Sequence, residues 1–329
     1  MKIALTGKPG CGRSTLFQAL GGGTRVDTGK PLTVDVPDER LDLLERIHEP
    51  LKKTHAKVVF SDIPSPCFCP RNLGMARNAA VIAAVLDNYA LGDLQTDLDE
   101  AETELMISDM ALCEKRLQRL KKEGKAGSGE FRLLSRLMER LEEGIPLRTL
   151  DLSPDCLDIL SPYSLLSLKP LMVICNRMGE PVTPEEEIEE AVNRHEGSLL
   201  RVDAGFELEL TELEPEERGA FLESAGYSRS GLDRIIRKAY SALDLIVFFT
   251  VGKDEVRAWP VKRGSTAVEA AGAVHSDMAR GFIRAEVVSW KTYSEVPDRN
   301  RLKETGDLRI EGKDYLIRDG DVVQIRFNV

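Results

Sequence analysis

The sequence lacks any apolar stretch of about 18 residues, the length at which a segment becomes a candidate membrane-spanning helix. It also lacks the pattern of a secretory signal, because the short apolar run Met1–Thr6 leads at once into a glycine-rich segment. We therefore expect neither a membrane span nor a membrane partner, and we predict a cytoplasmic location.

The six cysteines do not form the paired framework that is typical of small secreted domains. They are Cys11, Cys67, Cys69, Cys113, Cys156 and Cys175. Cys67 and Cys69 are too isolated and too closely spaced to predict a zinc site. This cysteine usage favours a reducing compartment.

An excess of positive charge is also missing, since 45 Lys and Arg stand against 55 Asp and Glu, a net charge of −10. An acidic average argues against nucleic-acid binding over the whole surface, although it leaves room for a local basic patch. The length of 329 residues is sufficient for two domains, and 42% apolar with 30% charged residues is typical of a soluble globular protein.

The stretch at residues 7–14, Gly-Lys-Pro-Gly-Cys-Gly-Arg-Ser, differs from the phosphate-loop pattern G-x-x-x-x-G-K-S only at Arg13. A buried-strand pattern at 3–7 precedes it and a helical pattern follows it, which is the setting that such a loop requires. Backbone N–H groups and the helix N-terminus would hold the phosphates. The predicted nucleotide contacts here are Gly7, Lys8, Pro9, Gly10, Cys11, Gly12, Arg13, Ser14 and Thr15.

Arg13 stands where the pattern has lysine. Arginine carries the same charge on a wider planar group, so it either binds phosphate in another pose or crowds it out. Lys8 offers a second hypothesis, in which its ammonium supplies the missing charge; otherwise it is an exposed loop lysine. Ser14 is a predicted Mg²⁺ ligand.

Four further buried-strand patterns, at 57–64, 79–88, 170–176 and 198–204, alternate with helical segments. This alternation predicts a mostly parallel sheet covered on both faces, with ligands at the carboxyl ends of its strands. Gly7, Asp62, Asn176 and Asp203 would gather there.

Asp62 opens a D-x-x-G motif in which Ser65 replaces the glycine, and Pro66 lies where many GTPases carry a water-orienting glutamine. We predict that Asp62 is either a Mg²⁺ contact or a structural residue at the strand end.

Asn176 opens the position of an N-K-x-D motif, where Gly179 replaces the aspartate that reads guanine. We predict base contacts from Asn176, Met178 and the loop at Ala204.

Residues 99–142 carry apolar residues at alternating spacings of three and four, on both sides of a polar, glycine-rich turn. This pattern predicts a coiled-coil hairpin, with one helix over 99–122. From Glu114 to Arg140 there are nine Lys or Arg and four Glu. This basic surface is either a solvated helix face or a contact for the phosphate backbone of RNA, for which we name Arg116, Arg119, Lys121, Lys122 and Arg132.

From about residue 246 short strand patterns surround one helical stretch at 265–279, which predicts a small α+β unit. Taken together, these features resemble the YchF family, an Obg-related branch of the P-loop GTPases. The segments that carry the resemblance include 36–47, 103–120, 164–176, 230–261, 275–290 and 311–329.

The resemblance implies an α/β fold in which a P-loop NTPase parallel sheet carries an inserted α-helical coiled-coil hairpin and a C-terminal β-grasp (TGS) domain. The expected divisions are 1–98 and 150–245 for the nucleotide domain, 99–149 for the insertion and 246–329 for the TGS domain. The resemblance also implies ATP or GTP with Mg²⁺, and a ribosome or RNA partner contacted by the hairpin and the TGS domain.

The departures from the family pattern cluster at the nucleotide site, at Arg13, Ser65 and Gly179, and in a shortened segment between Asp62 and Ala80. No effector threonine is evident, although Thr28 or Thr33 could serve. Two interpretations follow: a nucleotide-binding protein with slow ATP or GTP hydrolysis, or a ribosome- or RNA-binding adaptor that no longer hydrolyses nucleotide. Oxidation of Cys11 inside the loop is a third, weaker hypothesis.

Overall fold

The computed structural model describes residues 1–24, 26–27, 29–65, 67, 69–89, 93–177, 179 and 183–328. The chain divides into two compact units. The first unit contains Met1–Val34 and Val58–Ala239, and the second contains Asp35–Lys57 and Tyr240–Val329. Among the described helices, none is both long and apolar enough to cross a membrane.

The first sheet has six strands in the order β2-β4-β1-β5-β6-β7, of which the last five are joined by parallel pairings. They are β1 (Lys2–Thr6), β2 (Leu32–Asp35), β4 (Lys57–Asp62), β5 (Val81–Asp87), β6 (Leu171–Asn176) and β7 (Ser198–Val202). The strand patterns at 3–7, 57–64, 79–88, 170–176 and 198–204 therefore correspond to real strands. Their carboxyl ends lie at one edge, which is where the predicted site residues occur.

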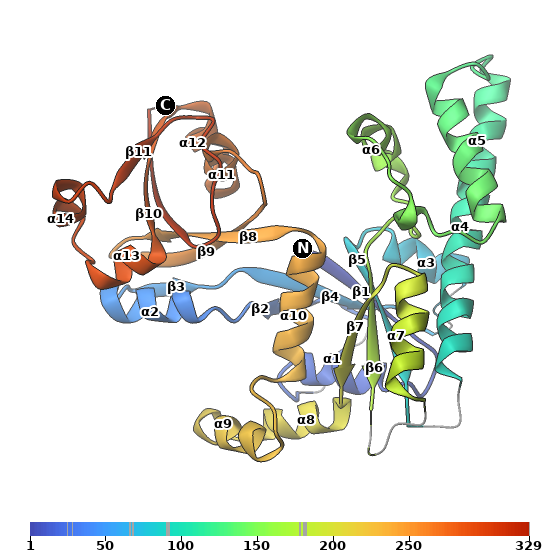
Figure 1. Cartoon of the computed structure of the whole chain (residues 1–329), viewed down its shortest axis with the longest axis horizontal. Coiled ribbons are helices and arrows are strands. Elements are labelled where there is room, and N and C mark those ends of the chain that lie inside the picture. Colours follow the sequence, from blue (N-terminus) through green and yellow to red (C-terminus); the bar gives the residue numbers. More distant parts are fainter. Residues whose placement is uncertain are drawn as a thin grey trace. The chain divides into compact units, whose positions relative to one another are not determined.

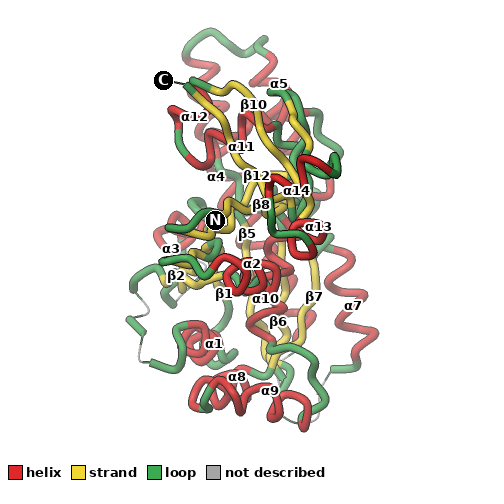
Figure 2. The backbone as a smooth tube through the Cα atoms, turned by 90° about the vertical axis from the view of Figure 1, so that its left-hand side faces the viewer, coloured by secondary structure: helices red, strands yellow, loops and turns green. Residues whose placement is uncertain are grey.

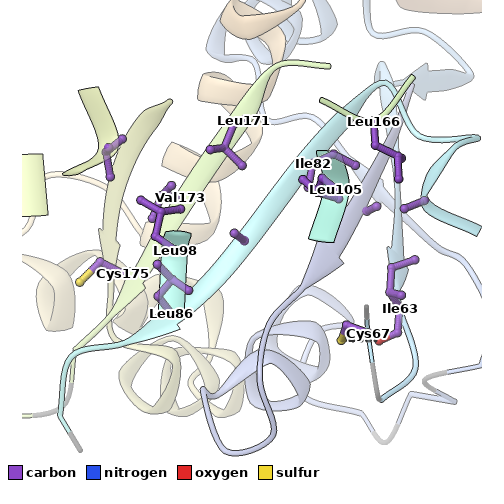
Figure 3. Close-up of a cluster of buried hydrophobic side chains, with 14 of the residues drawn as sticks. Ile63, Cys67, Ile82, Leu86, Leu98, Leu105, Leu166, Leu171, Val173 and Cys175 are labelled. Carbon is purple, nitrogen blue, oxygen red and sulfur yellow. Dashed lines mark hydrogen bonds between the residues drawn. The ribbon is translucent and has the colours of Figure 1, made fainter. Parts of the chain in front are cut away.

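Both faces of this sheet are covered, because alternate residues of its central strands are buried on opposite sides. Ile82, Leu86 and Val173 belong to one core with residues of α4, as Figure 3 shows. The intervening residues Leu5 and Val85 are also fully buried, on the other face.

The helices of the first unit connect and cover these strands. They are α1 (Arg13–Leu20), α3 (Pro70–Ala76), α4 (Leu94–Lys122), α5 (Gly129–Glu142), α6 (Pro154–Leu160), α7 (Glu185–Arg194), α8 (Ala204–Glu212), α9 (Pro215–Ser224) and α10 (Gly231–Ala242), with 3₁₀ turns at Leu147–Thr149 and Ser161–Tyr163. α1 and α8 pack against each other (Figure 1, Figure 2).

α4 and α5 are the two helices expected between residues 99 and 142, and they pack against each other (Figure 1). The apolar residues with the predicted spacing all belong to one cluster, together with residues of the following segment: Met106, Met110, Cys113, Leu117, Leu120, Phe131, Leu134, Met138 and Leu141. α4 begins at Leu94, five residues earlier than expected, because the Asp93 side chain caps it by accepting a hydrogen bond from the Gln95 N–H at 3.1 Å. Its first turns pack into the sheet core through Leu94, Leu98 and Leu105.

The second unit contains a six-stranded sheet in the order β11-β10-β12-β8-β9-β3. Its strands are β3 (Lys52–Thr54), β8 (Leu245–Val251), β9 (Glu255–Lys262), β10 (Phe282–Ser289), β11 (Arg309–Glu311) and β12 (Asp321–Phe327). Its helices are α2 (Glu39–His48), α11 (Ala267–Val274), α12 (Ser276–Arg280), α13 (Trp290–Glu295) and α14 (Arg299–Glu304). The helical stretch at 265–279 is thus two helices, separated where His275 adopts an extended conformation.

Residues 35–57 belong to the second unit, whereas the sequence-based division places them in the nucleotide domain. The physical reason is that β3 pairs in parallel with β9, and α2 packs against β8 and β9. The boundary expected at residue 246 also lies earlier in the structure, at Tyr240.

Candidate functional site

The loop between β1 and α1 contains three glycines in backbone conformations that favour glycine. Gly7, Gly10 and Gly12 have φ angles of 152°, 90° and 84°, a region in which residues with a side chain are strained. Gly12 directly precedes α1, so the N-terminus of that helix faces the loop. A side chain at Gly7 would also collide with the Val85 carbonyl, 2.4 Å from an ideal Cβ.

The Arg13 side chain is buried and bound to protein groups. Its Nε lies 2.5 Å from Oδ1 of Asp62, and the two side chains are only 9% and 3% exposed. Nη1 donates to the Gly7 carbonyl at 3.0 Å and to the Cys67 thiol, and Nη2 donates to the Ser65 hydroxyl at 3.3 Å. The guanidinium group therefore links the loop to the last residue of β4 and to the segment that follows it.

Asp62 occupies the predicted metal position at the end of β4, where it pairs with Leu5 of β1. Burial raises the pKa of Asp62 above its ordinary value, and the positive charge of Arg13 opposes this rise. The Asp62 carboxylate forms an ion pair with the Arg13 guanidinium. The residue that opens the D-x-x-G motif is therefore paired with the arginine that replaces the lysine of the phosphate-loop pattern. Within the described residues no cluster of three or more His, Cys, Asp or Glu is arranged as a metal site.

Lys8, the other candidate cation, turns toward α4. Its ammonium lies 2.5 Å from Asp97 and 2.7 Å from Glu100. Hydrogen bonds to these two carboxylates raise the pKa of Lys8. The structure thus places Lys8 in the loop, but its charge is neutralised by the first two turns of α4.

Asn176 joins two loops of the site. Its Nδ2 donates to the Cys11 carbonyl at 3.0 Å, and its Oδ1 accepts from the Ala204 N–H at 2.9 Å. Gly12 lies against the same amide, since an ideal Cβ there would be 2.0 Å from Nδ2. The structure therefore brings the predicted residues Cys11, Gly12, Asn176 and Ala204 together at the ends of β1, β6 and β7.

A cavity of about 200 Å³ lies beside this junction. It is lined by Arg177, Gly179, Glu185, Arg201, Val202, Asp203, Tyr227 and Arg234. Gly179 leaves the base-reading position without a carboxylate, and Arg177 is paired with Glu185 at 2.7 Å. Tyr227 and Arg234 come from the α9–α10 region and were not expected from sequence, because no motif links them to the loops after β6 and β7.

The remaining predicted residues have less distinctive surroundings. Pro9, Gly10 and Ser14 are exposed and Thr15 is half-buried, as a loop open to a ligand requires. Thr33 is an exposed residue of β2. Thr28, Pro66 and Met178 lie outside the described residues.

Cys11 is a buried residue of the loop. Burial is the main cause that raises the pKa of its thiol. A thiol with a raised pKa carries little thiolate, the form that reacts with peroxide, so this environment disfavours the oxidation hypothesis.

Comparisons with known proteins agree with the resemblance. A family model named YchF-GTPase_C, described as "Protein of unknown function (DUF933)", matches residues 245–328. The "Ribosome-binding ATPase YchF" of Haemophilus influenzae is 34% identical over 364 residues, covering 100% of this chain and 99% of the relative. The protein of the same name from Bacillus subtilis is also 34% identical, covering 100% of both chains.

A solved structure gives the same result for the fold. The chain is similar to the YchF GTPase of Schizosaccharomyces pombe with a TM-score of 0.89 and 26% identity, covering 99% of this chain and 97% of the other. The mixed α/β architecture with two sheets is thereby confirmed. Because the sequence match to relatives at 34% identity extends over the full length of both partners, this chain belongs to the YchF family.

Proposed function

We propose that this chain is a nucleotide-binding protein that takes ATP or GTP, hydrolyses it slowly or not at all, and associates with the ribosome through RNA. The observation that carries nucleotide binding is the loop at 7–15, in which three glycines with positive φ lead into the N-terminus of α1. Such loops offer backbone N–H groups and a favourable helix field to phosphate oxygens.

Slow hydrolysis follows from the groups around the loop. Phosphoryl transfer needs positively charged groups that contact the transferred phosphate and a residue that orients the attacking water. Arg13 is bound to Asp62, and Lys8 is bound to Asp97 and Glu100, so both nearby cations are already paired. The D-x-x-G glycine is replaced by Ser65, and proline follows it in the sequence.

Association with the ribosome is supported by the printed name of the relatives, "Ribosome-binding ATPase YchF". The tip of the α4–α5 pair supplies a suitable surface, since Lys121, Lys122 and Arg132 are exposed. Arg119 is exposed but paired with Glu123 at 2.9 Å, and Arg116 is paired with Glu130 at 2.8 Å. The three exposed side chains are thus the better candidates for contacts with RNA phosphates.

The sheet of the second unit offers another basic surface. Glu286 of β10 is buried, and three arginines surround its carboxylate: Arg284, Arg299 and Arg326. One carboxylate among three guanidinium groups leaves a net positive charge, and each arginine side chain is 40–50% exposed. This arrangement supports a contact between the expected TGS region and phosphate groups of RNA.

Nucleotide binding is tested by measuring the melting temperature of the full chain at increasing concentrations of ATP or of GTP. We expect a concentration-dependent rise with at least one nucleotide, because a ligand that binds only the folded state stabilises it. Phosphate release no faster than from Arg13→Ala would indicate binding without turnover. Absence of any shift would favour the alternative, an adaptor whose loop has lost the nucleotide.

Co-sedimentation with ribosomes tests the second half of the proposal. Charge reversal at Lys121, Lys122 and Arg132 should release the protein at low salt, and the difference from the wild type should shrink as salt increases. Reversal at three exposed basic residues of the first unit outside the hairpin, Lys2, Arg71 and Arg194, serves as the matched control. Equal sedimentation of the two triple variants would contradict a role for the hairpin.

A further inference from the structure

The buried pair of Arg13 and Asp62 has a consequence for the metal that P-loop proteins usually bind with their nucleotide. In the expected arrangement, Ser14 and Asp62 would hold Mg²⁺. In this structure the Asp62 side chain is 3% exposed, and its Oδ1 lies 2.5 Å from the Arg13 Nε. The positive charge of Arg13 therefore already contacts this carboxylate. The carboxylate is not free to turn toward a second cation.

Arg13 is also held by more than this one contact. Nη1 donates to the Gly7 carbonyl and Nη2 to the Ser65 hydroxyl, at 3.0 Å and 3.3 Å. Moving Arg13 away would leave Asp62 as an unpaired buried charge, which is strongly unfavourable. A divalent cation beside Asp62 would instead face a guanidinium at short range, where like charges repel. The residues present therefore do not fit the expected Mg²⁺ site.

Thermodynamic linkage relates the poor fit of Mg²⁺ at Asp62 to the effect of Mg²⁺ on the affinity for the nucleotide. Mg²⁺ strengthens nucleotide binding only to the extent that the protein helps to hold the metal, relative to the nucleotide in water. Once Asp62 is paired with Arg13, the protein's remaining contribution among the expected ligands is the exposed Ser14 hydroxyl. A metal gains little from the site and is repelled by the neighbouring guanidinium.

We propose that nucleotide binding at the 7–15 loop does not require Mg²⁺, because the Arg13 guanidinium occupies the place of the cation at Asp62. This inference rests on the proposed nucleotide binding. A P-loop protein with a weakened metal site would still bind its nucleotide more tightly with Mg²⁺. In this chain the Arg13 guanidinium takes the contact with the Asp62 carboxylate that the metal would make.

Calorimetric titration of the full chain with ATP and with GTP, each in Mg²⁺ and in EDTA, tests the proposal. The expected dissociation constants with and without metal agree within about threefold. Mn²⁺ as a spectroscopic probe gives a second readout: the protein should not raise the affinity of Mn²⁺ for the nucleotide. An affinity that improves tenfold or more in Mg²⁺, about 1.4 kcal/mol, would overturn the inference but leave the proposed function standing.

Arg13→Lys sharpens the test. A lysine has one compact charge and cannot hold Asp62, the Gly7 carbonyl and Ser65 at once. We therefore expect Mg²⁺ to strengthen nucleotide binding by about tenfold or more in this variant. Arg194→Lys, the same change on the exposed end of α7, should behave as the wild type.

The outcomes of these titrations separate the two proposals. If the wild type binds neither nucleotide in any buffer, the proposed function fails and the inference falls with it. The wild-type comparison of Mg²⁺ with EDTA is decisive even if Arg13→Lys does not fold.

Discussion

At the scale of single residues, Gly12 is constrained twice. Its φ of 84° disfavours any side chain, and an ideal Cβ would lie 2.0 Å from the Asn176 amide. That amide also holds the Cys11 carbonyl and the Ala204 N–H, so a displaced Asn176 would disturb two loops. The close approach explains why the position before α1 is glycine.

We predict that Gly12→Ala lowers the free energy of unfolding by more than the about 1–2 kcal/mol that a left-handed conformation costs a residue with a side chain. Urea unfolding measures this change. Gly10→Ala is the matched control, because its φ is 90° but an added Cβ would meet no atom within 4 Å. Equal losses in the two variants would mean that the contact with Asn176 is relieved at no cost.

We predict that stability depends on pH through His48, the last residue of α2. Its ring stacks on Tyr293 with centroids 5.4 Å apart, and burial lowers the pKa of His48 below its ordinary value of 6.5. The unfolded chain therefore takes up this proton at a higher pH than the folded protein does. Stability from this group is fully present above about pH 6.5 and falls as the pH drops toward the folded-state pKa.

Unfolding measured by denaturant between pH 7.5 and 5 tests this prediction. Relative to His48→Phe, which keeps an aromatic ring but cannot titrate, the wild type should lose stability below about pH 6.5, by no more than about 1.4 kcal/mol per pH unit. A constant difference between the two proteins across this range would show that His48 is protonated equally in both states.

The residues that belong to a motif of fixed spacing were predictable. The loop glycines, Asn176 and Ala204 meet at the strand ends, because parallel strands place their carboxyl ends at one edge. The strand order predicted that Asp62 lies near the loop, but nothing in the sequence showed that Arg13 would pair with it. The pairing of Lys8 with Asp97 was not predictable either, since Asp97 belongs to a helix that no motif links to the loop. The roles of the predicted contact residues toward a nucleotide stay predictions.

At the scale of elements, α4 depends on a buried acid. Asp109 accepts hydrogen bonds from the Leu166 and Ser167 N–H groups at 2.9 and 2.8 Å. It also accepts from the Ser167 hydroxyl and lies 2.8 Å from Nη1 of Arg77. One carboxylate thus fastens the middle of the long helix to the end of α3 and to the segment before β6.

We predict that Asp109→Ala destabilises the protein by about 3–5 kcal/mol, because it leaves Arg77 and two backbone donors without this acceptor. Chemical denaturation gives the magnitude. Glu114→Ala, an exposed acid on the same helix, should change stability by less than about 0.5 kcal/mol. A small effect of Asp109→Ala would imply that water replaces the carboxylate.

The elements that the sequence indicated most clearly were those with strong apolar periodicity. β5 and β6 are almost continuously buried, and the α4–α5 seam follows its predicted spacing. β2 and β3 were not predicted, because strands of four and three residues with few buried side chains carry no clear pattern. Their existence depends on neighbours that are distant in sequence.

At the scale of the whole molecule, the chain passes between the two units three times, after Val34, Lys57 and Ala239. The expected division at residue 246 could not capture this path, because nothing in the sequence of 35–57 shows which distant strand it pairs with. Only the pairing of β3 with β9 reveals where the segment belongs. Sequence similarity over the C-terminal region alone therefore underestimates the second unit.

This path leads to a prediction about fragments. A fragment of residues 240–329 would lack β3, leaving the edge of β9 unpaired, and would lack α2, which packs on β8 and β9. It would also lose Arg40, which covers the Phe249 ring at 5.2 Å and pairs with Asp319 at 2.7 Å. Exposed strand edges and uncovered apolar rings promote aggregation, so we expect this fragment to be poorly soluble or to melt without cooperativity.

Joining residues 35–57 to 240–329 through a flexible linker should restore a soluble monomer with a cooperative transition, because the joined chain contains every strand of the second sheet. Light scattering and thermal melting of the two fragments compare them directly. If both melt at the same temperature with the same cooperativity, residues 35–57 contribute little to the second unit. A gain only in the joined fragment would mean that a segment near the N-terminus is required to complete a sheet whose other strands all follow residue 244.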